Sequence, residues 1–425
     1  MTERYKIPIE IMAPVGSYES LTAAIQGGAD SVYFGVGRLN MRSRSSQNFS
    51  MEDLKEIVRI CEENHVKSYV TLNTIVYDDE LEEMRSIVDA VRGNSVTAII
   101  ASDMSVINYA LEQGVEVHLS TQTNITNIEA VRYYARFADV IVTARELSLD
   151  QVSVITQKIK EERITGPSGA LLRIEVFAHG ALCMAISGKC YLSLDNENHS
   201  GNRGACYQLC RRPYKVTDLD GKNELVIDNE YIMSPKDLCT IEFLDKIVDS
   251  GVQVLKIEGR GRSADYVKTV TRCYKEASIA LSDGTYTQER INHWLSSLRK
   301  VYNRGFWSGY YLGKKMGEWT KKYGNLATHK KIYVGKITNY FTRLKIAEVK
   351  LETMALSVGD EIRIIGPTTG VYEGVAEEIR VDYETVSQAE KGVTCSIPVD
   401  TFLRRSDKLY KVVPSDSVTD DGQQW

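Results

Sequence analysis

Short runs of β-branched and apolar residues alternate with amphipathic stretches through the first 260 residues of the chain. The segments between the runs, such as 18–29 and 51–64, repeat apolar residues at helical spacing. The runs that have the length and composition of buried strands begin near residues 9, 31, 67, 97, 115, 139, 171 and 252. Eight strand and helix repeats within about 270 residues are typical of a closed (β/α)8 barrel.

A doubly wound open sheet is the alternative arrangement for such a pattern. Open sheets that bind dinucleotides or nucleoside triphosphates carry GxGxxG or GxxxxGK[ST] directly after a strand. Neither motif follows any of the predicted strands. The pattern therefore favours an α/β fold of the TIM-like barrel type.

The connection after the seventh predicted strand is abnormally long. The strand ends near His179, and the next helix is expected to begin near Pro235, whereas connections of this type usually have about two to six residues. Barrel enzymes build their active sites from the loops that follow the strands. An insertion at about 180–235, with a hairpin-like segment at 214–228, is therefore expected on the catalytic face.

The chain after the barrel changes in composition. It is expected to contain a linker at 299–330, a small β-barrel of short alternating strands at 331–413, and a disordered tail at 414–425, after a barrel domain at 1–298. Residues 299–345 contain twelve Lys or Arg, one acid and ten aromatic residues, although the whole chain has a net charge of −5. This basic aromatic segment predicts contact with nucleic acid. Burial of its tyrosines between the domains is the alternative, and the loop with Arg38, Arg42 and Arg44 is expected to extend the same surface.

The chain has no export signal and no apolar run long enough to cross a membrane, so a soluble cytoplasmic protein without membrane contact is expected. Because the cytosol keeps thiols reduced, the eight cysteines are not expected to form disulfides. Cys61, Cys273 and Cys395 are expected in the hydrophobic core.

The other five cysteines have the spacing of a metal centre. Cys183, Cys190, Cys206 and Cys210 follow C-x6-C-x15-C-x3-C, and Cys239 comes after 28 further residues. Structural zinc usually requires two closely spaced pairs, which the first two thiols do not supply. An iron-sulfur cluster accepts ligands from several loops and is favoured over zinc or unligated thiols. Spacing alone does not select four ligands from the five.

Polar side chains interrupt the predicted strands at their carboxyl ends, where a barrel meets solvent. The candidates for substrate binding are Asn73, Gln122, Arg145, Lys256 and Arg260, and those for catalysis are Glu175, His179 and Glu258. Three cations there would suit an anionic small molecule. A network of ion pairs that only closes the barrel is the alternative. HExxH and GxSxG are absent, which disfavours proteolysis.

Several segments resemble a known family. They are MAPVGSYESLTAAIQGGADSVYFG, HLSTQ, FAHGALCMAISGKCYLS, GNRGACYQLCRRPY and SPKDLC, and the likeness continues into NRGFWSGYYLGKK. These segments resemble the proteins historically labelled U32 peptidases or collagenase-like proteases, and within them the tRNA hydroxylation protein P group.

The resemblance implies an oxygen-independent hydroxylase with a 4Fe-4S cluster, which makes 5-hydroxyuridine at the wobble position of tRNA with prephenate, a dicarboxylate, as hydroxyl donor. The ligands that it implies are Cys183, Cys190, Cys206 and Cys239, and Cys210 occupies a place used in some relatives. A U32-type endopeptidase and a noncatalytic iron-sulfur RNA-binding module are the alternatives. The sequence leaves open which tRNAs are used and whether a partner protein takes part.

Overall fold

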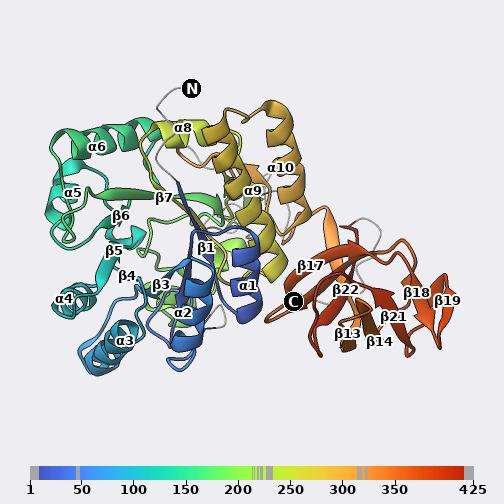
Figure 1. Cartoon of the computed structure of the whole chain (residues 1–425). Helices are drawn as coiled ribbons and strands as arrows, with labels where there is room; N and C mark the ends of the chain where they lie inside the picture. The colour runs from blue at the N-terminus through green and yellow to red at the C-terminus, as the bar shows by residue number, and fades with distance from the viewer. Residues whose placement is uncertain are drawn as a thin grey trace.

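The eight predicted strands form a closed parallel barrel in the computed structural model of the chain (Figure 1). They are β1 (Glu10–Pro14), β2 (Ser31–Gly35), β3 (Lys67–Leu72), β4 (Ala98–Ala101), β5 (Glu116–Leu119), β6 (Val140–Val142), β7 (Arg173–Gly180) and β11 (Val254–Ile257). They pair in this order, and β11 closes the ring by pairing with both β7 and β1. The TIM-like fold expected from the sequence is therefore confirmed.

The structure describes residues 9–44, 48–212, 214, 216–217, 220, 224–225, 233–313, 318–320 and 324–415. In this part of the chain no helix is long and apolar enough to cross a membrane.

Helices cover the outside of the barrel because their apolar residues fall on one face. In α2 (Leu54–Glu63) the buried residues are Leu54, Ile57, Val58 and Cys61, which form one helical stripe. The strands are buried on both faces, as parallel strands under helices must be. The other helices of the barrel domain are α1 (Tyr18–Gln26), α3 (Leu81–Gly93), α4 (Met104–Glu112), α5 (Ile128–Tyr134), α6 (Leu149–Glu161), α8 (Leu244–Asp249), α9 (Ala264–Asp283) and α10 (Gln288–Lys300).

The end of the long insertion differs from the sequence expectation. A helix was expected from near Pro235, but the chain first forms β10 (Asp237–Cys239), and α8 begins only at Leu244. The cause is the length of β7, because β6 pairs only with its first three residues and leaves its far end free. There β10 pairs antiparallel, with Cys239 opposite His179, and β12 (Phe306–Trp307) adds beside β10.

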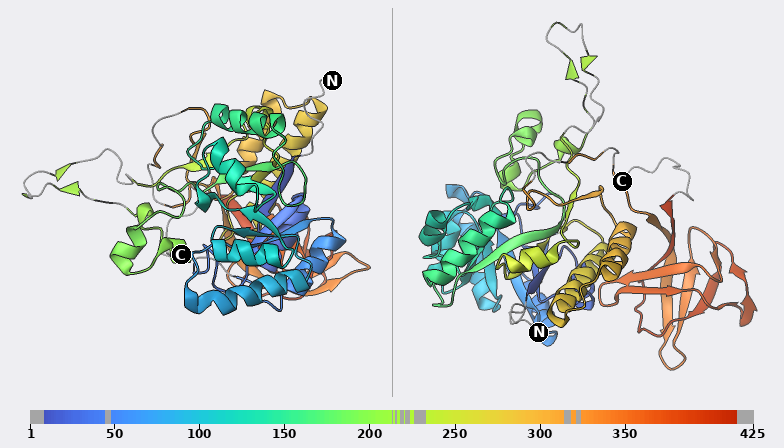
Figure 2. Two further views of the ribbon diagram at one scale, coloured as in Figure 1. Left: turned by 90° about the vertical axis from the view of Figure 1, so that its left-hand side faces the viewer. Right: turned by 90° about the horizontal axis from the view of Figure 1, so that it is seen from above.

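The insertion contains the short helix α7 (Leu192–Glu197) and the paired strands β8 (Val216–Thr217) and β9 (Glu224–Leu225). It projects from the barrel in light green in Figure 2. The β8 and β9 pairing agrees with the expected hairpin, and most of the remaining hairpin residues lie outside the described part of the chain.

The C-terminal domain is an antiparallel sheet around its own core. Its main strands are β13 (His329–Phe341), β14 (Ile346–Leu351), β16 (Glu361–Gly366), β17 (Gly370–Val375), β18 (Ile379–Val381), β19 (Glu384–Val386), β21 (Thr394–Pro398) and β22 (Lys408–Pro414). They pair in the order β17, β16, β22, β13, β14, β21, β18, β19, and β15 (Leu356–Ser357) pairs with β20 (Gln388–Ala389). Alternation of buried and exposed residues along β14 shows that one face is packed against the core. The last ten residues of the expected tail lie outside the described residues.

Asp265, at the start of α9, joins the two domains. Its carboxylate bonds Arg363 at 2.8 Å and also pairs with Lys331, both from the C-terminal domain. Asp265 and Arg363 are only 5% and 6% exposed. Burial opposes ionisation, but the two cations outweigh it and hold the pKa of Asp265 below its usual range.

The substitution Asp265→Ala is expected to lower the free energy of unfolding by about 3 kcal/mol, because it leaves buried Arg363 with only the more distant carboxylate of Glu373, at 3.7 Å. Urea denaturation checks this. Since the pKa of Asp265 is depressed in the folded state, its contribution is complete above the ordinary Asp pKa of about 3.9 and is lost as the pH falls through the lower folded value. Glu378→Ala, which breaks an exposed pair with Arg380, is the control and should change stability little; equal effects would contradict the assignment.

Candidate active site

A cavity of about 160 Å³ lies at the carboxyl ends of the barrel strands. Its volume is comparable with cavities that accept one aromatic ring. Of the residues predicted from the sequence, it is lined by Asn73, Gln122, Arg145, Cys183, Cys206, Lys256, Glu258 and Arg260. The barrel places these side chains together because each lies at, just after or in a loop beyond the end of a strand.

Lys256, on β11, is held by Glu175 of β7. Its Nζ lies 2.8 Å from Oε1 of Glu175, and both side chains are almost completely buried. The other carboxylate oxygen of Glu175 has no hydrogen-bond partner among the described residues. Glu175 does not line the cavity, so the structure gives it the position of a counter-ion to Lys256.

Glu258, directly after β11, is the carboxylate inside the cavity. Its Oε1 accepts from Arg42 at 2.8 Å, and its Oε2 accepts from the hydroxyl of Tyr33 at 3.4 Å. Burial acts to raise the pKa of Glu258, but the charges of Arg42 and Arg145 outweigh it and lower the pKa to about 2. Glu258 is therefore ionised at neutral pH and is a counter-ion in this arrangement rather than a proton donor.

Arg260 is a buried cation without a carboxylate within ion-pair distance among the described residues. Its Nη1 donates to the side-chain oxygens of Asn40, at 3.1 Å, and Thr71, at 2.7 Å. Burial lowers the pKa of Arg260 to about 10. A buried guanidinium that is bound only by neutral oxygens keeps its full positive charge, so binding of an anion beside it is strongly favourable.

Arg145, after β6, also has unused hydrogen-bonding capacity. Its guanidinium lies over the ring of Phe177, at 4.0 Å from the centroid. Its Nε is buried and has no hydrogen-bond partner among the described residues. This donor is available to a ligand at the barrel mouth.

The charges around the cavity do not cancel. Among the described residues, four cations, Arg42, Arg145, Lys256 and Arg260, face two carboxylates, Glu175 and Glu258, which leaves a surplus of two positive charges. The described carboxylates therefore do not neutralise all the cations of this site. A dianion of small size would balance the charge.

His179 lies outside this cavity. It is 1% exposed and packs against Tyr266, Tyr274 and Phe306, and the Tyr274 hydroxyl lies 3.4 Å from its Nδ1. Burial lowers the pKa of His179 to about 3, so the ring is neutral at physiological pH. The structure does not bring this predicted catalytic residue together with the others.

Sequence reasoning missed several residues of the cavity, and two of them, Tyr33 and Arg42, contact its charged groups. Tyr33, on β2, places its ring 4.5 Å from Nζ of Lys256. Arg42 was expected on a nucleic-acid surface, but its guanidinium binds Glu258 inside the mouth. The position of Tyr33 within a strand was a usable signal, whereas Arg42 comes from a loop whose direction the sequence does not specify.

The insertion thiols lie beside the cavity. Cys183 and Cys206 line it, and the pKa of Cys210 is raised to about 11 by burial, with further contributions from the charges of Cys183, Cys206 and Cys190. All the cysteines are free. Cys239 is 3% exposed, and its sulfur accepts a hydrogen bond from Tyr274 at 3.9 Å. Cys210 thus lies in the insertion with the first three thiols, whereas Cys239 lies on β10, buried beside Tyr274.

The basic aromatic segment makes many internal contacts. Arg304 pairs with Asp237 at 3.4 Å, Lys331 pairs with Asp265, and Lys336 pairs with Glu352 at 2.9 Å. Trp307 and Tyr311 are buried, and the Tyr311 hydroxyl donates to the Phe177 carbonyl. Burial, the alternative left open by the sequence, therefore accounts for these two aromatics. Lys314, Lys315, Lys321 and Lys322 lie outside the described residues.

Comparison with known proteins finds one family model and two kinds of named relatives. The model of peptidase family U32 matches residues 16–321. A collagenase of Porphyromonas gingivalis is 59% identical over 95% of this chain and 97% of that protein. The tRNA hydroxylation protein P1 of Bacillus subtilis is 32% identical over 84% of this chain and 83% of that protein. A 23S rRNA 5-hydroxycytidine synthase of Escherichia coli is 33% identical over 73% of this chain and 46% of that protein.

The charge surplus predicts that the cavity binds small dicarboxylates. Succinate is expected to bind more tightly than butyrate, and Arg260→Met is expected to weaken succinate binding about tenfold or more, because a charge-assisted hydrogen bond is lost. Since the pKa of Arg260 is about 10, the affinity should be constant between about pH 6 and pH 9 and fall at higher pH, where this cation loses its proton. Calorimetric titration measures both effects.

The control is Arg405→Met, which removes an exposed cation of the C-terminal domain. It should leave the affinity for succinate unchanged. Equal binding of succinate and butyrate, or equal losses in the two variants, would contradict a dianion site at the barrel mouth.

Proposed function

Because this chain belongs to peptidase family U32, as its match over residues 16–321 establishes, we propose that it is an oxygen-independent tRNA uridine C5-hydroxylase. The proposed product is 5-hydroxyuridine at the wobble position, and the proposed hydroxyl donor is prephenate. The observation that carries the proposal is the doubly cationic cavity lined by two cysteines of the insertion. The relatives named as tRNA and rRNA hydroxylation proteins support an RNA substrate.

The cavity fits a small dianionic donor. Prephenate has two carboxylates, and the barrel mouth has two positive charges that no protein carboxylate balances. Arg145 and Arg260 are the cations without a carboxylate partner at ion-pair distance among the described residues, so we assign them to the two carboxylates of the donor. Lys256, held by Glu175, adds to the field that favours a dianion.

The donor set of the insertion fits a 4Fe-4S cluster. No three His, Cys, Asp or Glu side chains of the described residues are close enough together to hold a single metal ion. A cluster distributes its thiolates over four irons, so its ligands lie farther apart than the ligands of one zinc ion. The insertion supplies four thiols from separate turns of its chain, which agrees with such a spread-out set. When bound, the cluster would supply electron transfer or Lewis acidity beside the cavity.

The residues of the chain have defined tasks in this proposal. Hydroxylation converts the C5–H bond of uridine into C5–OH, a two-electron oxidation, and the donor that loses its oxygen is reduced by the same two electrons. Arg145 and Arg260 bind and orient the donor, and Glu258 keeps Arg42 in place while remaining ionised. The target uridine has to leave its stack in order to reach a cavity at the end of a barrel.

The fourth cluster ligand can be tested with two single substitutions. The resemblance implies Cys239, but this residue is buried on β10 beside Tyr274, so we assign Cys210, which lies in the insertion with the other three thiols. Cys210→Ala is therefore expected to lose most of the bound iron and its sulfur-to-iron absorption, while Cys239→Ala keeps both. Iron analysis and absorption spectra of anaerobically purified protein measure this.

Cys395→Ala, which alters a buried thiol of the C-terminal domain, is the matched control and should keep its iron. The opposite pattern, with iron lost in Cys239→Ala and kept in Cys210→Ala, would return the fourth position to Cys239.

Proteolysis is the second candidate, because a relative with 59% identity is named a collagenase. A cysteine peptidase needs a histidine in contact with its nucleophile. Among the described residues no hydrogen bond joins a cysteine to a histidine, and the histidine predicted as catalytic lies outside the cavity. These observations make the hydroxylase the better supported function.

Nucleoside mass spectrometry of tRNA decides between the functions. Cells that lack the gene are expected to lose 5-hydroxyuridine and its derivatives. Wild type and Cys395→Ala should restore them, whereas Cys190→Ala should not, because it removes a cluster ligand. Unchanged tRNA in the deletion strain would refute the proposal, and cleavage of denatured collagen by the anaerobic protein, abolished by one substitution, would establish the peptidase.

A further inference from the structure

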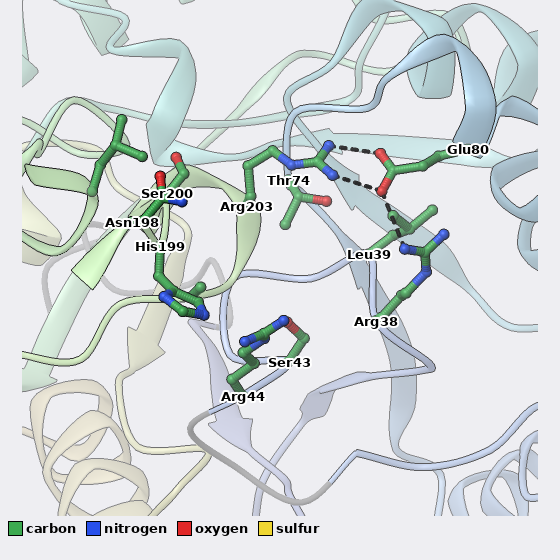
Figure 3. A pocket seen from close by; sticks show the side chains of 12 residues that line it. Arg38, Leu39, Ser43, Arg44, Thr74, Glu80, Asn198, His199, Ser200 and Arg203 are labelled. Atoms are coloured by element: carbon green, nitrogen blue, oxygen red, sulfur yellow. Dashed lines mark hydrogen bonds and ion pairs between the residues drawn. The ribbon is translucent and has the colours of Figure 1, made fainter.

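A second hollow, which we call the rim cleft, lies beside the barrel mouth. It has a volume of about 340 Å³ and is formed by the loop after β2, by Glu80, and by residues of the insertion (Figure 3). The ionisable residues that line it are Arg38, Arg44, Glu80, His199 and Arg203. None of these belongs to the cavity described above.

Glu80 fixes the arginines of the rim cleft. Arg203 donates to both its carboxylate oxygens, at 2.6 and 2.7 Å, and Arg38 lies 3.5 Å from it, as the dashed lines of Figure 3 show. Glu80 is 2% exposed, so its carboxylate is buried under the two guanidinium groups. Although Arg38 also pairs with Glu83 at the outer edge, one buried carboxylate serves two arginines inside the cleft.

Arg44 is the available cation of the rim cleft. Its side chain is exposed and makes no hydrogen bond or ion pair with the other described residues. It comes from the same loop as Arg42, which is anchored to Glu258. A free cation on an anchored loop is suited to a phosphate group that passes over the surface.

Two exposed tyrosines adjoin the rim cleft. Tyr77 is 55% exposed, and Arg203 lies 3.7 Å from its ring centroid. Tyr207 is 44% exposed and packs edge-on against the ring of His199, with the centroids 5.0 Å apart. Exposed aromatic rings beside cations are the usual means of binding unstacked nucleotides.

The rim cleft is continuous with the barrel mouth along the chain. Arg42 and Cys206 line the mouth cavity, while their neighbours Ser43 and Ala205 line the cleft. The loop after β2 and the insertion segment around Cys206 therefore each line the mouth cavity with one residue and the rim cleft with the next. An RNA strand that places one base at the mouth has its adjoining phosphates within reach of the cleft.

We propose that the rim cleft binds the sugar-phosphate backbone of the RNA substrate beside the nucleotide that is modified, with Arg44 on a phosphate and Tyr207 stacked on a neighbouring base. This inference rests on the proposed function, since it takes RNA as the substrate. It places the RNA contact on the insertion side of the barrel rather than on the basic segment at 299–345, where Arg304, Lys331 and Lys336 are paired internally.

Filter binding of an unmodified tRNA transcript to the full chain, purified anaerobically, tests the rim cleft. Arg44→Ala is expected to weaken binding about fourfold at 0.15 M salt and to reduce the slope of log Kd against log salt by about 0.7, the value for one lost phosphate contact on a single strand. Arg44→Glu should weaken it at least tenfold. Tyr207→Ala should weaken binding about tenfold without a change in the slope, because stacking involves no counterion release.

The matched control is Arg343→Ala, which removes an exposed cation of the basic segment. It should change the affinity less than twofold. Three results would each contradict RNA binding in the rim cleft. They are an equal loss of affinity in Arg343→Ala and Arg44→Ala, unchanged affinity in the Arg44 and Tyr207 variants, and no tRNA binding by the wild type.

Hydroxylation of the same transcript, measured by nucleoside mass spectrometry, separates this inference from the proposed function. If the Arg44 and Tyr207 variants lose affinity for tRNA but the wild type does not hydroxylate it, RNA binding in the rim cleft would be supported and the proposed hydroxylase activity would be refuted. Unchanged tRNA affinity with loss of gelatin cleavage in Arg44→Ala would overturn the RNA site and assign the cleft to a peptide.

Discussion

The ion pair between Glu258 and Arg42 connects the parts of this protein that carry its chemistry. Glu258 is fixed at the barrel by its backbone, whose amide donates to His179 and whose carbonyl accepts from Tyr266. Gly180 permits this close approach, because a Cβ there would lie 2.4 Å from the Glu258 carbonyl oxygen. Through its side chain Glu258 then anchors the loop that carries Arg42. One side of that loop closes the mouth cavity, and the other forms the rim cleft.

The barrel mouth contains more cations than carboxylates among the described residues, and this excess of positive charge does not help the chain to fold. Burying a cation without a balancing anion is unfavourable, and the depressed pKa of Arg260 expresses that tension. The barrel tolerates it because hydroxyl and amide oxygens of Asn40 and Thr71 solvate the guanidinium, and because a large core surrounds the site. Such an arrangement becomes favourable when an anion arrives, so the unbalanced charge is evidence of binding rather than of stability.

The sequence predicted the barrel well, because eight parallel strands between helices leave a strong periodic pattern. Four of the five charged residues that line the mouth could also be predicted, since charged residues at the ends of apolar strands have few other places to lie. The direction in which single side chains point could not be predicted. His179 sits at a strand end like the others, yet the free edge of β7 recruits β10 and encloses this ring among aromatics. Cations of the basic segment looked available in the sequence, because a pairing such as that of Arg304 with Asp237 depends on tertiary contacts.

The charge of the mouth also bears on the two names carried by relatives of this chain. A peptide bond is neutral, so the scissile group of a collagen-like substrate would not offset the buried cations of the cavity. A dicarboxylate supplies that charge, and a nucleic acid supplies a further series of negative charges outside the mouth. In the proposed function, anionic substrates account together for cations in both hollows, Arg145 and Arg260 in one and Arg44 in the other, whereas the neutral peptide bond accounts for neither.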